Sequence, residues 1–514
     1  MRPCLTHFAA LLAAGCIVAF PARSDAQAFA DLKSALVDYS IGDAAPKASC
    51  EALAASFKAK DVVSLKTRAI AAAGGVPAHC RVSGVLSPEI GFEVNLPAKW
   101  NRRLYMIGNG GLAGEQPDDA ARAAQRAGAL GKSFVMVSTD TGHKNTERPN
   151  GVFAQRNPQT AIDYAYRAVH LTLVTARSIA DAYYGSPVER AYWNSCSNGG
   201  RQGLIEAERF PRDFDGIIAN APWVDQTGYA IGAIWNERAI TETPVSLEKL
   251  KLVGERAMAK CDALDGVKDG LIDDPRKCDF DPARDVPELT PGEAATLKKI
   301  YGGPMSNGKR VFPGYMVGSE HNGGWANLIV RGRADAAPAD FSLADATMKY
   351  LVFNPPRPDW NYMTFDFDKQ VGVVDRWGKV ANATDPDLSG FRKRGGKLIM
   401  TYGWADAILQ PLMGVNYYEG VLAKNGDRTR DFARLFMVPG MAHCGGGVGP
   451  DQNDTVTAII DWVEKGKAPD LVVARKIVDG KVTRSRPLCP YPQVARYKGD
   501  GSIDDASRFS CVAP

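Results

Sequence analysis

The stretch "AYWNSCSNGGRQGLIEA", residues 191–207, decides the fold of this chain. An apolar run, a tight Ser/Gly-rich segment and an amphipathic run follow one another, which predicts a buried strand, a sharp turn and a helix. Ser197 lies at the turn, with the small residues Ser195 and Gly199 two positions before and after it. Small residues there let strand and helix approach closely, so that the serine hydroxyl stands above the edge of a sheet. A plain Gly/Ser loop entering a helix is the alternative.

Several other stretches have the continuous apolar character of strands that are buried on both faces of a parallel sheet. They are residues 103–111, 133–142, 214–223, 396–406 and 433–444, and helical periodicity covers 157–185 and 199–210. Alternating strands and helices predict a doubly wound α/β sheet. Residues 226–392 lack this unit and are richer in Pro, Gly, Asp and Trp. We therefore expect them to form an insertion that divides a core of residues 27–225 and 393–514.

The bulk composition is that of a soluble globular protein. The chain has 514 residues, of which 45% are hydrophobic, and its formal net charge is +4. This small charge excess is spread along the chain and gives no support to a nucleic-acid partner. Beyond the first 20 residues, no apolar run is long enough for a membrane span.

The N-terminus has the pattern of an export signal. Arg2 precedes the apolar run 8–20, and Ser24-Asp25-Ala26 offers the small residues that a signal peptidase requires. We predict a signal peptide over residues 1–26, cleavage after Ala26 and a secreted or periplasmic protein. Lipidation at Cys16 is the weaker alternative, because the apolar run continues past it.

Export changes how the ten cysteines are interpreted. Removal of Cys4 and Cys16 with the signal peptide leaves eight, an even number, for which roughly a hundred disulfide connectivities exist. The pairs that close local loops are Cys50–Cys80, Cys261–Cys278 and Cys489–Cys511, and they leave Cys196 with Cys444. A zinc site is disfavoured because the chain has no C-x-x-C pair.

Two later motifs complete a candidate catalytic triad with Ser197. In the α/β-hydrolase fold the acid and the histidine follow the serine in chain order. "GWADAIL" places Asp406 after a predicted strand, and "GMAHCGGG" places His443 after the last one. Asp406 would orient His443, which would accept the proton of Ser197. Taken alone, Asp406 would equally suit a helix N-cap.

A bond between Cys196 and Cys444 would bring this serine and histidine together. A disulfide holds its Cα atoms about 4.4–6.8 Å apart, and neighbouring residues lie about 3.8 Å apart. If that pair forms, the Cα atoms of Ser197 and His443 are at most roughly 14 Å apart.

The expected donors to a tetrahedral oxyanion are two backbone N–H groups. One is that of Asn198, and the other is that of Gly111 or Gly110 in "IGNGGLAG", residues 107–114. A dinucleotide-binding role for these glycines is disfavoured because no clear helix follows them. His143 follows a strand and is a candidate for the cleft wall.

The segment "CDALDGVKDGLIDDPRKC", residues 261–278, is a candidate calcium loop. Asp262, Asp265 and Asp269 repel one another in a small loop unless a hard cation lies among them, and the carbonyls of Val267 and Leu271 would complete the oxygen ligands. A solvated acidic turn is the alternative.

The motifs "CSNGGRQG", "GWADAIL", "MAHCGGG", "CDALDGVKDGLID" and "TDTGH" together resemble the tannase and feruloyl esterase family, which is similar to mono(2-hydroxyethyl) terephthalate hydrolases. The resemblance spans essentially the whole mature chain. It implies an α/β-hydrolase fold with a large lid inserted between the nucleophile and acid strands, and the Cys196–Cys444 disulfide. It also implies a Ser197–Asp406–His443 triad and Ca²⁺ bound by the five residues of the candidate loop.

The implied activity is hydrolysis of esters of aromatic carboxylic acids, such as feruloyl, galloyl or related aroyl esters. Trp325, Trp360 and Phe365 of the insertion are candidates for contact with an aryl ring, although each equally suits a core position. Two other functions stay open: a serine peptidase of the same fold, and a catalytically silent protein that binds phenolics or carbohydrate.

Overall fold

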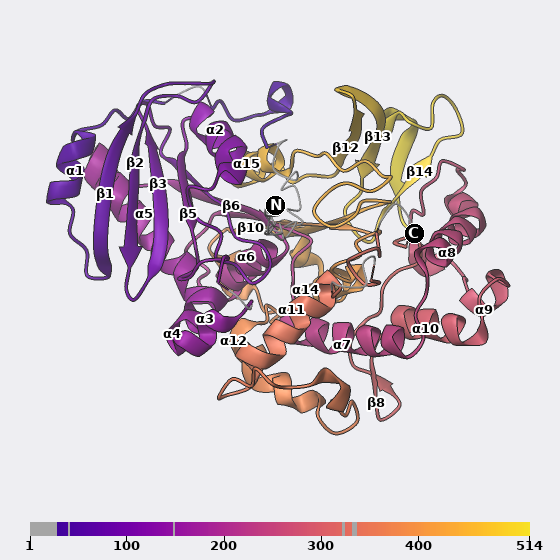
Figure 1. The fold of residues 1–514 in the computed structure, drawn as a ribbon. Helices are drawn as coiled ribbons and strands as arrows, with labels where there is room; N and C mark the ends of the chain where they lie inside the picture. Colours follow the sequence, from indigo (N-terminus) through magenta and orange to yellow (C-terminus); the bar gives the residue numbers. More distant parts are fainter. Residues whose placement is uncertain (1–27, 40–41, 148–149, 321–323, 332–336) are drawn as a thin grey trace, which may run out of the picture.

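The computed structural model describes residues 28–514 except 40–41, 148–149, 321–323 and 332–336, so the predicted signal peptide lies outside the described residues (Figure 1). A single sheet of nine strands, in the order β1-β2-β3-β5-β4-β6-β7-β10-β11, forms the centre. Its strands are β1 (Val62–Ile70), β2 (His79–Leu86), β3 (Ile90–Pro97), β4 (Arg103–Met106), β5 (Val135–Thr139), β6 (Arg190–Cys196), β7 (Gly216–Asn220), β10 (Lys397–Gly403) and β11 (Ala433–Val438).

Six strands of this sheet are those predicted from the sequence, namely β4, β5, β6, β7, β10 and β11. Neighbours among them pair in parallel. The prediction missed β1, β2 and β3, which join antiparallel at the other edge of the sheet. Strand β1 alternates between half-buried and exposed residues, so it lacks the continuous apolar run that marks the central strands.

Helices cover both faces of the sheet, which is why its central strands are apolar throughout. Helices α5 (Ala168–Tyr184), α6 (Asn198–Arg209) and α14 (Pro411–Asn425) pack on one face, whereas α2 (Ala123–Gly131) and α15 (Thr455–Lys465) pack on the other (Figure 1). Successive residues of β4 accordingly contribute to different cores: Leu104 and Met106 to one, Tyr105 to the other.

The predicted insertion occupies the chain between the neighbouring strands β7 and β10. It contains α7 (Gln226–Glu242), α8 (Leu247–Cys261), α9 (Pro282–Asp285), α10 (Pro291–Gly302), α11 (Ala339–Ala346), α12 (Asp375–Ala381) and a short hairpin, β8 (Met305–Ser306) and β9 (Lys309–Arg310). Residues of α7 and α12 belong to the same buried cluster as the strands and helices of the central sheet. The insertion therefore packs directly on the core at one side of the molecule (Figure 1).

The remaining elements are short. They are α1 (Cys50–Ser56), α3 (Val152–Arg156), α4 (Pro158–Ile162), α13 (Ser389–Lys393), β12 (Val472–Val478), β13 (Lys481–Leu488), β14 (Val494–Tyr497) and β15 (Phe509–Val512). A π-helical segment, Asp163–Arg167, joins α4 to α5. Among the described residues, no helix combines the length and apolarity that a membrane crossing needs.

Candidate active site

Ser197 occupies the turn between β6 and α6 in a backbone conformation that side chains rarely adopt, with φ 64° and ψ −125°. Such strain costs about 1–3 kcal/mol and persists only where its surroundings hold it. Here the Ser197 N–H donates to the Asn220 carbonyl at 3.0 Å, and the Ser197 carbonyl accepts the Trp223 N–H at 3.0 Å. Both partners lie at or just beyond the end of β7, so the neighbouring strand holds the serine in place.

The glycines after Ser197 are required by the close approach of α6 to the sheet. A Cβ atom at Gly199 would lie 1.9 Å from the Ser195 hydroxyl oxygen, and one at Gly200 would lie 2.7 Å from the Asn220 carbonyl oxygen. Ser195 therefore fills the position where the usual motif has glycine, and any larger side chain there would meet Gly199.

The disulfide between Cys196 and Cys444 brings the His443 loop to the serine turn, with the two Cα atoms 5.9 Å apart. A ring nitrogen of His443 lies within 4.8 Å of the sulfur atoms of both cysteines. Elsewhere in the part of the chain that the structure describes, the bonded pairs are Cys50–Cys80, Cys261–Cys278 and Cys489–Cys511.

Asp406 is fully buried and receives three hydrogen bonds. Its Oδ1 accepts the N–H groups of Ile408 and Leu409, each at 2.9 Å, and its Oδ2 lies 2.8 Å from Nδ1 of His443. A carboxylate can only accept, so the His443 proton resides on Nδ1 and leaves Nε2 with a free lone pair. A base with that tautomer, next to a serine, is equipped to take a hydroxyl proton.

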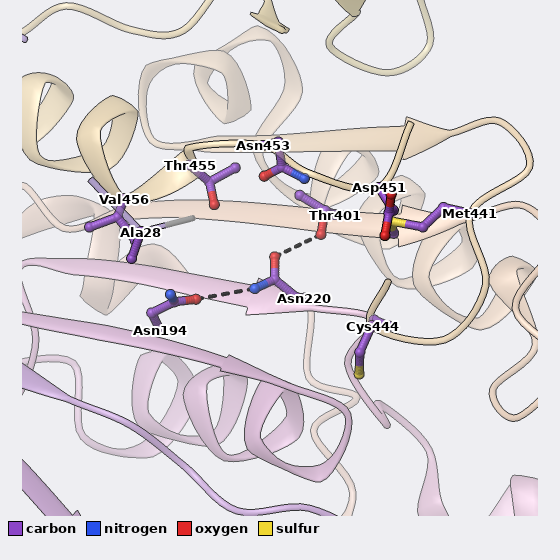
Figure 2. Close-up of a pocket in the computed structure, with 11 residues that line it drawn as sticks. Ala28, Asn194, Asn220, Thr401, Met441, Cys444, Asp451, Asn453, Thr455 and Val456 are labelled. Carbon is purple, nitrogen blue, oxygen red and sulfur yellow. Dashed lines mark hydrogen bonds between the residues drawn. The ribbon is translucent and has the colours of Figure 1, made fainter. Parts of the chain in front are cut away.

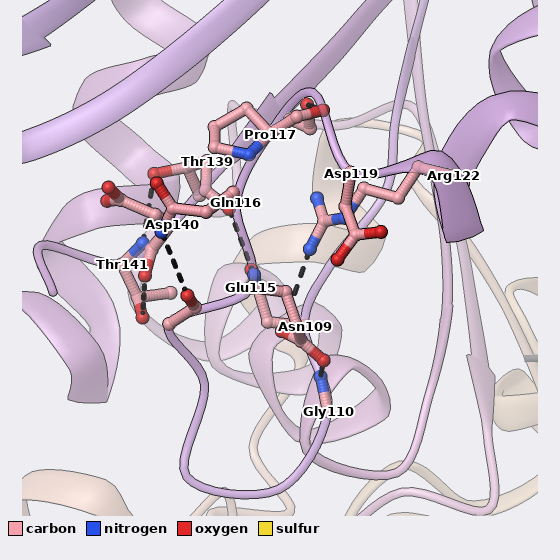
Figure 3. Close-up of polar contacts among 12 residues, drawn as sticks. Asn109, Gly110, Glu115, Gln116, Pro117, Asp119, Arg122, Thr139, Asp140 and Thr141 are labelled. Atoms are coloured by element: carbon pink, nitrogen blue, oxygen red, sulfur yellow. Dashed lines mark hydrogen bonds and ion pairs between the residues drawn. The ribbon is translucent and has the colours of Figure 1, made fainter. Parts of the chain in front are cut away.

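The glycine loop after β4 is held by side chains that occupy its first N–H groups. Asn109 N–H donates to Gln202 Oε1 at 3.0 Å, and Gly110 N–H donates to Glu115 Oε1 at 2.8 Å (Figure 3). The Gly110 carbonyl accepts the Ala113 N–H at 2.8 Å. Since a peptide unit is planar, this bond directs the Gly111 N–H to the opposite side. Gly111 is thus the next donor along the loop.

Asn198 supplies the other expected donor, because it is the first residue of α6 and its N–H has no acceptor within the helix. Sequence reasoning missed Glu115 and Gln202. The Gln202 contact joins residues 93 positions apart, and the Glu115 contact is to a backbone N–H, so neither leaves a spacing signal.

Two buried charged residues, Arg122 and Asp140, lie near Glu115. Arg122 Nη2 lies 3.6 Å from Glu115 Oε2, and the Asp140 carboxylate accepts the N–H groups of Gly91 and Gly142 at 2.8 Å each (Figure 3). Burial raises the pKa of Asp140 from 3.8 to about 7.

This shift predicts a pH-dependent stability. Between about pH 4 and pH 7 the folded chain keeps a proton on Asp140 that the unfolded chain has lost, so the free energy of unfolding falls as pH rises through this window. Asp140→Asn keeps an oxygen acceptor for both N–H groups and removes the titration. Urea unfolding at pH 5 and pH 8 should show a shallower pH slope for the variant and a gain of about 1–3 kcal/mol at pH 8. Equal slopes for both proteins would contradict this assignment.

A small polar cavity lies behind the disulfide, lined by Cys444, Asp451 and Asn453 among others (Figure 2). Within it, Thr401 Oγ1 donates to Asn220 Oδ1 at 2.7 Å, and Asn220 Nδ2 donates to Asn194 Oδ1 at 3.1 Å. These three side chains lie on the neighbouring strands β10, β7 and β6. Their hydrogen bonds hold Asn220, whose carbonyl accepts the Ser197 N–H.

The other cleft candidates are buried, except for the half-buried Trp360. His143 is 5% exposed, places Nε2 2.9 Å from the Leu112 carbonyl oxygen and stacks on Phe153, so it supports the glycine loop instead of lining a cleft. Trp325 lies in the insertion's own core, and Phe365 is buried beside the half-buried Trp360.

In the candidate calcium loop, each of the three carboxylates has a protein partner. Asp262 Oδ1 accepts the N–H groups of Asp269 and Gly270, each at 3.0 Å, and Asp265 Oδ1 accepts the Val267 N–H at 2.9 Å. Asp269 forms an ion pair with the buried Arg486. The donor chemistry fits a hard cation. As these side chains lie, the carboxylate oxygens of Asp262, Asp265 and Asp269 do not all come within 4.8 Å of one another.

Comparisons with known proteins show to which family the chain belongs. The family model described as tannase and feruloyl esterase matches residues 74–512. A mono(2-hydroxyethyl) terephthalate hydrolase from Piscinibacter sakaiensis is 31% identical, with 87% of each chain covered. A probable feruloyl esterase from Arthroderma benhamiae is also 31% identical, with 81% of each chain covered.

Solved structures show the same architecture. Feruloyl esterase B from Aspergillus oryzae matches with a TM-score of 0.76 and 28% identity, covering 90% of this chain and 100% of that one. A tannin acyl hydrolase from Aspergillus niger matches with a TM-score of 0.71 and 21% identity, covering 88% and 90%. The predicted α/β-hydrolase fold is therefore confirmed. The chain belongs to the tannase and feruloyl esterase family and is a carboxylic ester hydrolase.

Proposed function

We propose that this protein is an exported serine esterase that cleaves esters of aromatic carboxylic acids through an acyl-enzyme. The observation that carries the proposal is the Cys196–Cys444 disulfide, which places the strained Ser197 turn beside a histidine already oriented by Asp406. Family membership and the names of the relatives support the substrate class.

In the first half of the proposed reaction, the Ser197 hydroxyl oxygen attacks the ester carbonyl carbon while His443 Nε2 takes its proton. The carbonyl oxygen becomes an oxyanion, which the N–H groups of Asn198 and Gly111 stabilise. The C–O bond to the alcohol then breaks, and His443 returns the proton to the leaving oxygen. Water repeats the sequence on the acyl-enzyme, which releases the aromatic acid and restores Ser197.

A panel of substrates tests this function directly. Methyl ferulate, methyl gallate and mono(2-hydroxyethyl) terephthalate should include at least one good substrate, and a p-nitroanilide peptide should be cleaved far more slowly. Preferred cleavage of the anilide would indicate a peptidase. No turnover of any of them, without labelling of Ser197 by a fluorophosphonate, would indicate a silent binding protein.

We further propose that the loop closed by Cys261–Cys278 binds Ca²⁺ through Asp262, Asp265 and Asp269, with the carbonyls of Val267 and Leu271. The ion would supply the positive charge that several neighbouring carboxylates require. In the calcium-bound protein, the proposed ligand Asp269 would divide its oxygens between the ion and Arg486.

Removal of calcium is therefore expected to lower stability. Chelation should reduce the free energy of unfolding by about 2–3 kcal/mol, as for a ligand present at roughly a hundred times its Kd, and Ca²⁺ but not Mg²⁺ should restore it. Asp265→Asn should abolish the response, whereas Asp279→Asn, whose side chain is 88% exposed just outside the loop, should keep it. A thermal unfolding curve that chelator leaves unchanged would exclude the site.

Export is the remaining part of the proposal. Its support is the N-terminal pattern together with four disulfides, which persist in oxidising compartments. The mass of the mature N-terminus tests it: the chain should begin at Gln27, and recovery of an uncut chain from the exported fraction would contradict cleavage.

A further inference from the structure

A chain of buried hydrogen bonds connects the insertion to both residues that carry the proposed oxyanion donors. Trp377 of α12 donates its Nε1–H to Gln226 Oε1 at 2.9 Å, and Gln226 Nε2 donates to the hydroxyl oxygen of Tyr164 at 2.8 Å. The Tyr164 O–H is directed at two acceptors, the Gly111 carbonyl oxygen and Asn198 Oδ1, each at 3.3 Å.

The direction of every bond in this chain follows from its chemistry. The Trp377 indole can only donate, so the amide of Gln226 must turn its oxygen toward it and its nitrogen toward Tyr164. The Tyr164 oxygen therefore accepts, and its own proton points to the oxyanion loop. No member of the chain can be reversed without leaving a buried donor unpaired, which costs about 1–3 kcal/mol.

A second connection runs from α12 to Asn198. Arg201 of α6 is fully buried; its Nη1 donates to the Ala381 carbonyl at the end of α12 at 2.7 Å, and its Nε donates to Asn198 Oδ1 at 2.8 Å. Because Asn198 Nδ2 is buried and has no partner among the described residues, the asparagine side chain is anchored there through its oxygen alone.

The place of Tyr164 in the fold suits a residue that positions the oxyanion donors. It lies in the π-helical segment between α4 and α5, a distortion that often marks functional sites. Tyr164, Gln226 and Trp377 are each at most 2% exposed, and in such a low-dielectric interior hydrogen bonds are stronger and hold their donors and acceptors more rigidly.

We infer that helix α12 of the insertion sets the geometry of the oxyanion hole through Trp377, Gln226 and Tyr164. Tyr164 acts as the positioning residue, because its hydroxyl ties the loop that carries Gly111 to the start of α6. The inference rests on the proposed function. It gives the insertion a part in transition-state stabilisation besides any contact with substrate.

Two conservative substitutions test the inference. Tyr164→Phe removes the hydroxyl and keeps the ring, and Trp377→Phe removes the indole N–H and leaves a smaller aromatic ring in its place. Loss of a whole oxyanion donor costs roughly 100-fold to 1000-fold in kcat, so a misaligned donor should lower kcat for an aryl ester about tenfold. KM should stay within about twofold. Affinity for an aryl trifluoromethyl ketone, whose hemiketal oxyanion uses the same donors, should fall in parallel, and affinity for the product acid should not.

The double variant provides a sharper readout, because residues acting in series are not additive. If Tyr164 and Trp377 act through one chain, the double variant should be little slower than the slower single variant. A multiplicative loss would overturn the serial connection.

Matched controls separate positioning from general loosening. Tyr166→Phe changes a neighbouring ring of the same π-helical segment, and Trp325→Phe removes another buried indole bond of the insertion, to Ser319. Both should keep kcat even where stability falls. The inference is overturned if Tyr164→Phe and Trp377→Phe keep full kcat, or if the controls lose as much. An inactive wild-type protein would instead refute the proposed function.

Discussion

Replacing Ser197 by alanine is expected to lower kcat for an aryl ester by about 10⁴-fold or more, since it removes the proposed nucleophile and with it the proposed covalent route. Stability should not fall, because the bonds that hold the turn are made by the Ser197 backbone and survive the substitution. Initial rates and urea unfolding of the two proteins measure both quantities.

Ser195→Ala is the matched control. It removes a hydroxyl two residues away, on the strand side of the turn, and should leave most of the activity intact. A Ser197→Ala protein that still cleaves the ester at a comparable rate would move the nucleophile to another residue.

Removing the Cys196–Cys444 disulfide is expected to have the second largest effect. The bond spans 248 residues, and the entropy of closing so long a loop predicts a loss of about 5 kcal/mol in the free energy of unfolding. The double Cys→Ala variant should also lose about 100-fold or more in kcat, because displacement of a catalytic group by about 1 Å costs that much. Paired measurements of kcat and urea unfolding separate the two losses.

The Cys489–Cys511 pair is the control for this experiment. It spans 22 residues near the C-terminus, so its removal should cost less stability and should leave kcat close to that of the intact protein. If both double variants retained the same activity, the disulfide would not be what aligns His443 with Ser197.

The sequence reveals the central strands and the motifs around Ser197, Asp406 and His443 because both leave local signals. Strands buried on two faces are continuously apolar. Because Ser197 follows Cys196 and His443 precedes Cys444, a disulfide between these cysteines limits the distance between the serine and the histidine. The helix after Ser197 is equally local, since its glycines must follow the turn directly.

What the sequence does not reveal depends on tertiary contact or on weak patterning. Strand β1 has no continuous apolar run, and it was missed for that reason. The connection from Trp377 through Gln226 to Tyr164 joins residues 151 and 62 positions apart, so no periodicity relates them. Glu115, although only five residues from Gly110, binds a backbone N–H and not a side chain, and therefore leaves no paired motif.

Mass analysis of the acyl-enzyme under non-reducing conditions tests the central claim most directly. After rapid mixing with a p-nitrophenyl aroyl ester and acid quenching, proteolysis should yield one disulfide-linked species. The account predicts that the Ser197 peptide carries the aroyl group and remains joined through Cys196–Cys444 to the peptide that contains His443. An aroyl group on any other residue, or recovery of the two peptides without that link, would contradict it.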